Sequence, residues 1–242
     1  MMRQRLAAVT LAVLAGVACD AEPRIVPASA IEHGAALFAS RSTSPAANNL
    51  FACATCHRAQ KKLNDQAILP GVRLAGALTR ASYWGGSEPD LLRAINHCRK
   101  HFQRAKLPWT PSDDQARALY AWLGSLPAEL PTAVTMSFVG DVADPPGGDA
   151  KAGGSVYAQA CAHCHGAAFS GKGRLAQSVP ALPQQTRADH PGYSPAQLRL
   201  VFVEKVRHGP FFGYGGSMPP FAREVLSDAQ LADVLAYLQL AR

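Results

Sequence analysis

Apolar side chains recur along the chain at the three- and four-residue spacing of an amphipathic helix. Leu91, Ile95, Cys98 and Phe102 form one such series, which predicts that Cys98 points into the protein interior. The same spacing, with Ser, Thr and Asp residues suited to cap a first turn, predicts further helices. These cover residues 31–40, 115–126, 150–160, 194–208 and a final stretch after Ser227. The pattern indicates an all-α fold, with one short strand favoured at 134–139.

Two short motifs of identical spacing occur, one in each half of the chain. They read Cys53-Ala54-Thr55-Cys56-His57 and Cys161-Ala162-His163-Cys164-His165. In C-x-x-C-H, one turn presents two thiols to the vinyl groups of a porphyrin, and the adjacent histidine ligates its iron. A second match makes chance a poor explanation. The sequence therefore predicts two haem c groups, attached through Cys53, Cys56, Cys161 and Cys164, with His57 and His165 as iron ligands.

The second half has further features around its motif. Gly154-x-x-Tyr precedes the motif, Met218 stands before Pro219-Pro220-Phe221, and a closing Leu-x-x-Val-Leu-x-Tyr-Leu helix begins at Leu231. Over about residues 148–242 this arrangement resembles the class I cytochrome c family. The resemblance implies that Met218 is the sixth ligand of the second iron.

The same resemblance suggests how the second proximal histidine is oriented. In the family, the carbonyl of a loop proline orients this histidine, and the corresponding residue here is Pro180 or Pro183. His190 and His208 offer other ligands for the second iron, but neither stands in a ligand-like context.

The first half, residues 31–126, resembles the same family with one departure, because no methionine lies between His57 and Leu126. The segment Ala94-Ile95-Asn96-His97-Cys98 is similar to the region that supplies a cysteine ligand in thiosulfate-oxidising dihaem cytochromes and in cytochrome subunits of the sulfur oxidation system. The sixth ligand of the first iron is thus expected to be Cys98.

Helical phase independently favours Cys98, which lies within the apolar stripe, since His97 lies about 100° and His101 about 60° from Cys98 around the helix axis. His101, His97, the later Met136 and an iron with no side-chain ligand remain alternatives. Free cysteine is also commonly a small buried hydrophobic residue, so Cys98 packed in the core without ligating iron is a further alternative.

The expected organisation is two tandem class I cytochrome c-like domains. The first covers residues 31–126 and the second residues 150–242. Residues 127–149 hold several prolines and form the expected linker.

The first 18 residues indicate export. Arg3 and Arg5 precede an apolar run too short for a confident membrane span, which is the layout of a signal peptide. The run ends at Cys19, where a lipoprotein-type cleavage would leave a lipidated cysteine and a membrane anchor; ordinary cleavage nearby is the alternative. Both place the protein in the periplasm, free or anchored to a membrane.

Charge adds little about partners. The formal net charge is +7, and removal of Arg3 and Arg5 leaves +5, an excess too small and dispersed to indicate nucleic-acid binding. The expected partners are redox proteins, an electron donor and an electron acceptor.

The leading functional expectation is a carrier of single electrons rather than an enzyme, and no catalytic residue is assigned. A thiolate ligand would make the first haem low in potential, and a thioether would make the second high, so electrons would pass from first to second. One alternative is a thiosulfate dehydrogenase-like oxidoreductase, with Arg99, Lys100 or Arg104 attracting a sulfur anion, although these charges are expected on the solvated side of their helix. Another is a haem subunit of a larger respiratory or photosynthetic complex.

Overall fold

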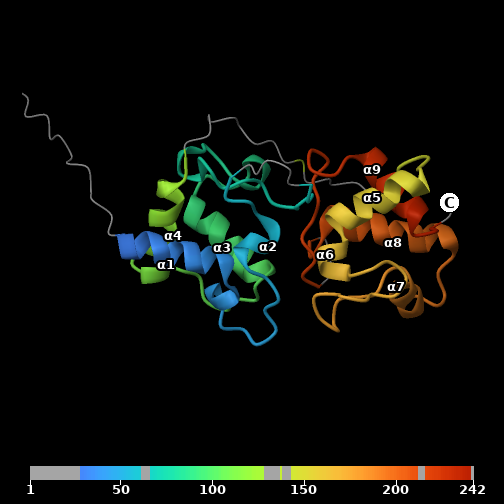
Figure 1. The fold of residues 1–242 in the computed structure, drawn as a ribbon, viewed down its shortest axis with the longest axis horizontal. Helices are drawn as coiled ribbons and strands as arrows, with labels where there is room; N and C mark the ends of the chain where they lie inside the picture. Colours follow the sequence, from blue (N-terminus) through green and yellow to red (C-terminus); the bar gives the residue numbers. More distant parts are fainter. Residues whose placement is uncertain (1–27, 61–65, 128–136, 138–142, 212–215, 241–242) are drawn as a thin grey trace, which may run out of the picture.

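The structure is a computed structural model that describes residues 28–60, 66–127, 137, 143–211 and 216–240. Within these ranges the regular elements are helices, and the extended pairing is a single bridge between Tyr83 and Glu88. Figure 1 shows the helices in two groups side by side, α1 to α4 and α5 to α9. The all-α fold expected from the hydrophobic spacing is confirmed.

One pair of packed helices frames the first group. These are α1 (Ala28–Ala39) and α4 (Asp114–Ser125). A side chain at Gly34 would run into the backbone carbonyl of Ala118, so the two helices touch backbone to backbone. Phe38 stacks on Trp122 with 4.5 Å between ring centroids. A small residue at the crossing therefore brings the neighbouring aromatic rings into contact.

The second group repeats this arrangement with α5 (Ala150–Ala160) and α9 (Asp228–Tyr237). Here a side chain at Gly153 would collide with the carbonyl of Asp233, whereas Gly154 meets only the Tyr237 ring. Tyr157 and Tyr237 lie 5.6 Å apart between centroids. The sequence pattern singled out Gly154, but the close crossing belongs to Gly153, one residue earlier.

The remaining helices belong to the same two groups, α2 and α3 to the first and α6 to α8 to the second. They are α2 (Cys53–Cys56), α3 (Leu91–His101), α6 (Ala162–His165), α7 (Gln184–Asp189) and α8 (Pro195–His208), with 3-10 turns at Arg41–Thr43, Ala77–Thr79 and Trp84–Gly86. Side chains cap three helices: Asp90 accepts from the amide of Arg93, and Ser194 and Ser227 form capping boxes with Gln197 and Gln230. At the start of α4, Asp113 makes no such bond to the helix. Helix α7 was not expected.

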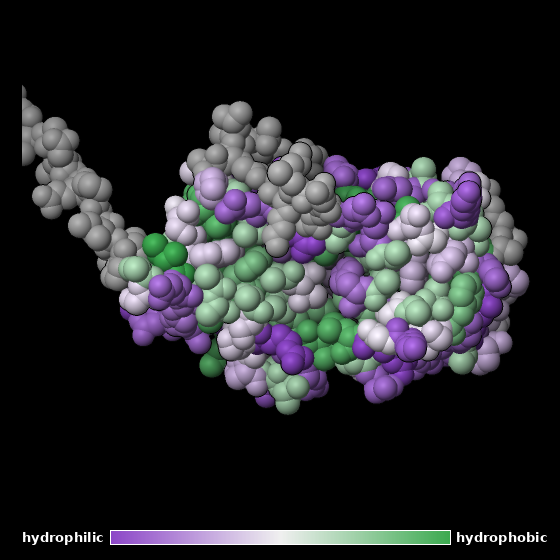
Figure 2. All heavy atoms as spheres, viewed as in Figure 1, coloured by the Kyte–Doolittle hydropathy of each residue, from purple (hydrophilic) through white to green (hydrophobic). Residues whose placement is uncertain are grey.

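Each group of helices has an apolar core of its own. The first core is built on Ala77, Trp109, Ala116, Leu119, Trp122 and Leu123. The larger second core contains Tyr157, Leu198, Phe202, Val203, Leu231, Val234, Leu235, Leu238 and Leu240. Figure 2 shows strongly hydrophobic residues gathered where the two groups meet, on a face where hydrophilic and hydrophobic residues otherwise alternate.

Contacts also join the two groups. Ile68 of the first group packs against a third cluster formed by Ala160, Phe221 and Leu226, and its amide donates to the Gln159 carbonyl at 3.0 Å. Apart from Ser137, the strand expected at 134–139 lies outside the described residues, as do the leader and Cys19. Across the part of the chain that is described, no helix has the length and apolar character needed to cross a membrane.

Candidate haem-binding sites

The first motif forms a single helical turn. Helix α2 spans the two cysteines, its first turn is fastened by a bond from the Ala52 amide to the Thr55 hydroxyl (3.1 Å), and His57 leaves the turn in an extended conformation. The thiols of Cys53 and Cys56 are three residues apart and therefore lie on the same side of the turn. Both are free and partly accessible. The turn can thus present two sulfur atoms in a row with an imidazole beside them.

Each motif histidine uses one ring nitrogen to bind the backbone. His57 Nδ1 lies 2.7 Å from the carbonyl oxygen of Val72, and His165 Nδ1 lies 2.9 Å from that of Pro180, both fifteen residues further along. A carbonyl only accepts, so Nδ1 carries the proton and Nε2 keeps its lone pair for a metal. The structure thereby selects Pro180 over Pro183.

Val72, the counterpart of Pro180, was missed by sequence reasoning. The equal separation from each motif histidine was the signal that could have identified it. Burial lowers the pKa of both His57 and His165, with the backbone bond acting in the opposite direction. Both imidazoles are therefore neutral around pH 7, which is the form that ligates iron.

A cavity opens beside the first motif. Cys53, Cys56, His57 and Cys98 line it together, within a largely apolar wall that includes Val72, Leu74, Trp84, Leu91, Ile95, Phe102, Leu119 and Leu123. Gly71 is required at its edge, because a side chain there would run into the His57 ring. Two thiols, a neutral imidazole and an apolar wall in one cavity fit a covalently attached haem.

Cys98 faces this cavity from α3, as its helical phase predicted. His97 and His101 do not line it. Their ring centroids lie 6.2 Å apart, with His97 beside Trp84 and His101 beside Phe211. Burial raises the pKa of the Cys98 thiol to about 12, so it is protonated until a metal displaces the proton. Of the side chains from Asn96 to His101 that could ligate iron, Cys98 alone reaches the cavity, while Met136 lies outside the described residues.

Arg99 differs from the sequence-based expectation. Its side chain is buried rather than solvated, with 6% of the residue exposed, because Nε donates to the Thr43 carbonyl and Nη1 to the Leu107 carbonyl. The guanidinium also lies 4.0 Å from the centroid of the Trp109 ring. Lys100 and Arg104 are exposed as expected. Arg99 is thus a cation built into the wall of the first cavity.

The second motif lies in a similar turn. Cys161 ends α5, Cys164 and His165 belong to α6, and the Tyr157 hydroxyl donates to the Gly166 carbonyl at 3.0 Å. His165 is buried, with 8% exposed. The structure therefore brings together the three residues that the second motif predicted.

Met218 packs beside this motif. It lies against the cluster of Ala160, Phe221 and Leu226, which Cys161 also contacts. The two other histidines of this half are engaged elsewhere: His208 bonds Glu204 at 2.5 Å, and His190 bonds the Thr186 carbonyl. The placement agrees with the sequence in favouring Met218 among these residues.

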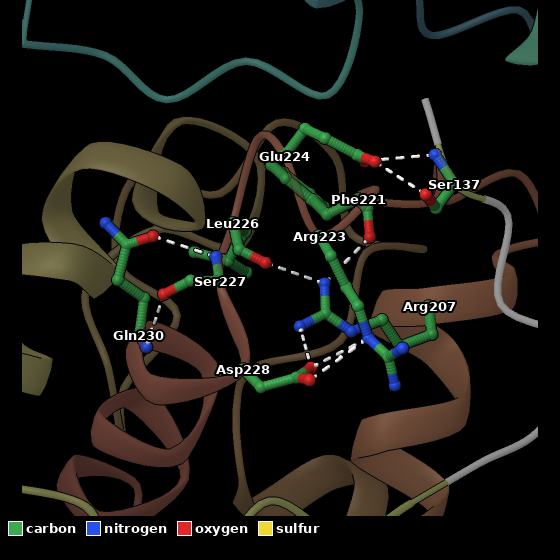
Figure 3. Close-up of polar contacts among 9 residues, drawn as sticks. All are labelled: Ser137, Arg207, Phe221, Arg223, Glu224, Leu226, Ser227, Asp228 and Gln230. Carbon is green, nitrogen blue, oxygen red and sulfur yellow. Dashed lines mark hydrogen bonds and ion pairs between the residues drawn. The ribbon is translucent and has the colours of Figure 1, made fainter. Parts of the chain in front are cut away.

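A buried arginine fixes the chain that follows Met218. Nη1 of Arg207 donates to the carbonyls of Phe221 (2.9 Å) and Leu226 (2.8 Å), and Nη2 donates to Asp228 (2.7 Å; Figure 3). The amide of Phe221 in turn donates to the Val206 carbonyl at 2.7 Å. The Arg207 guanidinium thus connects α8 and the start of α9 to the segment that follows Met218.

The two motifs lie close to each other. Burial and then the neighbouring Cys98 and Cys164 thiols raise the pKa of Cys56. In Figure 1, α2 and α6 lie on the facing sides of the two groups. Pro219 and Pro220, directly after Met218, also line the cavity of the first site. One short segment therefore borders both sites.

Comparison with known proteins identifies part of the chain. Residues 148–238 match the family model for Cytochrome C oxidase, cbb3-type, subunit III, so this part is a cytochrome c-type domain, which implies haem c, electron transfer and redox partner proteins. No curated protein matches the chain. A solved structure of thiosulfate dehydrogenase from Marichromatium purpuratum, in its as-isolated form, is similar with 21% identity and a TM-score of 0.44. The alignment covers 91% of this chain and 48% of that one, so the chain spans about half the length of that structure.

Proposed function

We propose that this protein is an exported dihaem cytochrome c that carries single electrons between redox partner proteins. The observation that carries the proposal is the repeated geometry of the two motifs. In each, a pair of thiols on one turn stands beside a histidine whose Nδ1 is bound to a carbonyl fifteen residues on. Since the family match covers the second motif alone, the geometric repeat is the argument that extends haem c to the first.

The proposed attachment uses Cys53 and Cys56 for the first haem and Cys161 and Cys164 for the second. When bound, haem c supplies a reversible one-electron iron couple at each site. The axial ligands are proposed to be His57 and Cys98 at the first iron, and His165 and Met218 at the second. The chain's part is to fix these ligands, to exclude water and to hold the two sites close together.

The proposed ligands imply a direction of electron transfer through the protein. A thiolate donates charge and favours ferric iron, whereas a thioether raises the reduction potential. Electrons would therefore enter at the lower-potential first site and leave from the second. Pro219 and Pro220, directly after Met218, line the cavity of the first site, which supports direct passage between the sites without an intervening partner.

Each site is proposed to belong to its own class I cytochrome c-like domain. Residues 31–126 would form the first and residues 150–242 the second, with 127–149 as linker. The separate cores of the two helix groups support this division. We further propose a periplasmic location, because c-type haem is attached outside the cytoplasm; this proposal, and lipid anchoring at Cys19, rest on the sequence pattern of the leader.

The direct test is to purify the exported protein and measure its haem content and redox behaviour. The proposal predicts two covalently bound haems per chain and two resolved one-electron steps. A variant in which Ala replaces both Cys53 and Cys56 should retain one haem and the higher-potential step. A wild-type protein with one haem per chain would contradict the proposal.

A second candidate function is favoured by the buried Arg99 in the first cavity, beside Cys98. In this alternative the first site oxidises thiosulfate: two thiosulfate anions form one S–S bond and give tetrathionate, and the two electrons released reduce the two haems. Mixing the oxidised protein anaerobically with thiosulfate tests it. Reduction of both haems with tetrathionate formed would establish the activity, and no reduction where a small electron donor reduces both would exclude it.

A further inference from the structure

The segment that carries Met218 is held by the other half of the protein. Arg104 Nη2 donates a hydrogen bond to Ser217 Oγ at 3.1 Å, across a sequence separation of 113 residues. Ser217 directly precedes Met218. A side chain of the first helix group therefore restrains the residue next to the proposed ligand of the second iron.

The backbone around Arg104 is built to make this contact. Arg104 adopts a left-handed conformation with φ of 57°, which is uncommon for a residue with a side chain. The turn around it closes onto α3, because the Phe102 amide bonds the Cys98 carbonyl and the Ala105 amide bonds the Arg99 carbonyl. The arginine is thus anchored to the helix turn that presents Cys98 to the first cavity.

Two further contacts join the same parts of the molecule. Phe211 of the second half lies 6.0 Å from Trp84 and 6.3 Å from Phe102 between ring centroids, and both of these rings line the first cavity. On the other side of Met218, Pro219 and Pro220 line the same cavity. The chain therefore packs against the first site on both sides of Met218, through Phe211 before it and through Pro219 and Pro220 after it.

We infer that Arg104 is a positioning residue for Met218, so that the first half of the protein sets part of the ligation strength at the second iron. This inference rests on the proposed function, in which Met218 ligates that iron. Without the bond from Arg104, Ser217 would be freer to move and Met218 would leave the iron more easily.

The test uses the purified dihaem protein and follows the absorption band that Met-ligated ferric haem shows and that thiolate-ligated haem lacks. Imidazole is added as a competing ligand. Arg104→Gly removes the side chain yet tolerates the left-handed backbone. In this variant the imidazole concentration that displaces Met218 should fall about threefold to fivefold, the effect of losing one exposed hydrogen bond. The variant should also lower the second reduction potential without altering the first haem's electron paramagnetic resonance signal.

Matched variants separate positioning from general destabilisation. Arg104→Lys keeps a donor and should restore most of the wild-type affinity for imidazole. Ser217→Ala should reproduce the effect of Arg104→Gly, and the double variant should add nothing to either, since both remove the same bond. Arg117→Ala, which alters an exposed arginine on α4 bonded to Asp114, should behave as wild type.

Met218→Ala distinguishes failure of the proposed ligand set from failure of the role proposed for Arg104. If Met218→Ala leaves the absorption band in place, the proposed ligand set is wrong. If it removes the band while Arg104→Gly and Ser217→Ala both match wild type in imidazole affinity and potential, the ligand set stands and the positioning role of Arg104 is overturned.

Discussion

The Nδ1 atom of His57 lies 2.7 Å from the carbonyl oxygen of Val72. This relationship reappears between His165 and Pro180, although a proline supplies the carbonyl in one half and a valine in the other. A carbonyl is present at every residue, so the repeat depends on where the loop passes and leaves little trace in residue type. Two loops of different sequence have thus been shaped to fix the same tautomer of the same side chain.

Gly71 is predicted to be needed for this geometry at the first site. In Gly71→Ala the new methyl group would run into the His57 ring and Cys56 carbonyl, so the imidazole must turn away. We expect an altered electron paramagnetic resonance signal or reduced haem content at the first site, with the second site unchanged. Gly192→Ala is the matched control, because its new methyl group meets open space. A Gly71→Ala protein with two wild-type signals would contradict the role assigned to Gly71.

Adjacent glycines in α5 should respond very differently to substitution. Gly153→Ala forces a methyl group into the Asp233 carbonyl at the crossing with α9, and we expect a loss of about 2 kcal/mol or more in the free energy of unfolding. At Gly154 the added methyl group meets only the edge of Tyr237 at 3.3 Å, and replacing a helix-interior glycine recovers up to about 1 kcal/mol.

Urea denaturation of the two variants provides the comparison. Gly154→Ala should stay near wild type in its unfolding midpoint, whereas Gly153→Ala should unfold at clearly lower urea concentration. Equal losses in both would show that the crossing is not centred on Gly153.

The attachment of the linker at Ser137 is predicted to weaken in acid. Bonds from the Ser137 hydroxyl and amide lower the pKa of Glu224 from its ordinary value of 4.5 (Figure 3). A carboxyl with a lowered pKa in the folded protein contributes stability above its ordinary pKa and loses it as the pH falls through the lowered value. The contact should therefore be intact at pH 7 and lost well below pH 4.5.

Limited proteolysis with an acid-active protease can measure this. Cleavage within residues 127–149 should accelerate as the pH falls below the ordinary carboxyl pKa, beyond the change of a peptide substrate. In Glu224→Gln the rate should already be high and should follow the peptide alone. A wild-type rate that tracks the peptide at every pH would refute the prediction.

The helices and their caps could be predicted from the sequence, because they depend on local spacing. Ser227 caps the final helix where expected, and the phase of α3 correctly turns Cys98 inward. Helix α7 escaped prediction because its sequence, Gln-Gln-Thr-Arg-Ala-Asp, is short and polar and has no apolar face.

What could not be predicted depends on partners far away in the chain. Arg99 looked like a solvated charge, yet carbonyls of Thr43 and Leu107 and the Trp109 ring surround it. The bond between Arg104 and Ser217 likewise has no local signature. Helical phase identifies which side of a helix faces inward, but it does not reveal which loop crosses that side.

The most direct test of the account is a redox titration followed by low-temperature electron paramagnetic resonance, on wild type, Cys98→Ala and Met218→Ala. We predict two low-spin ferric signals, with the lower-potential one changed only by Cys98→Ala and the higher-potential one only by Met218→Ala. If Cys98→Ala leaves both signals and both potentials unchanged, or if the signal it alters has the higher potential, the proposed two-site electron carrier is contradicted.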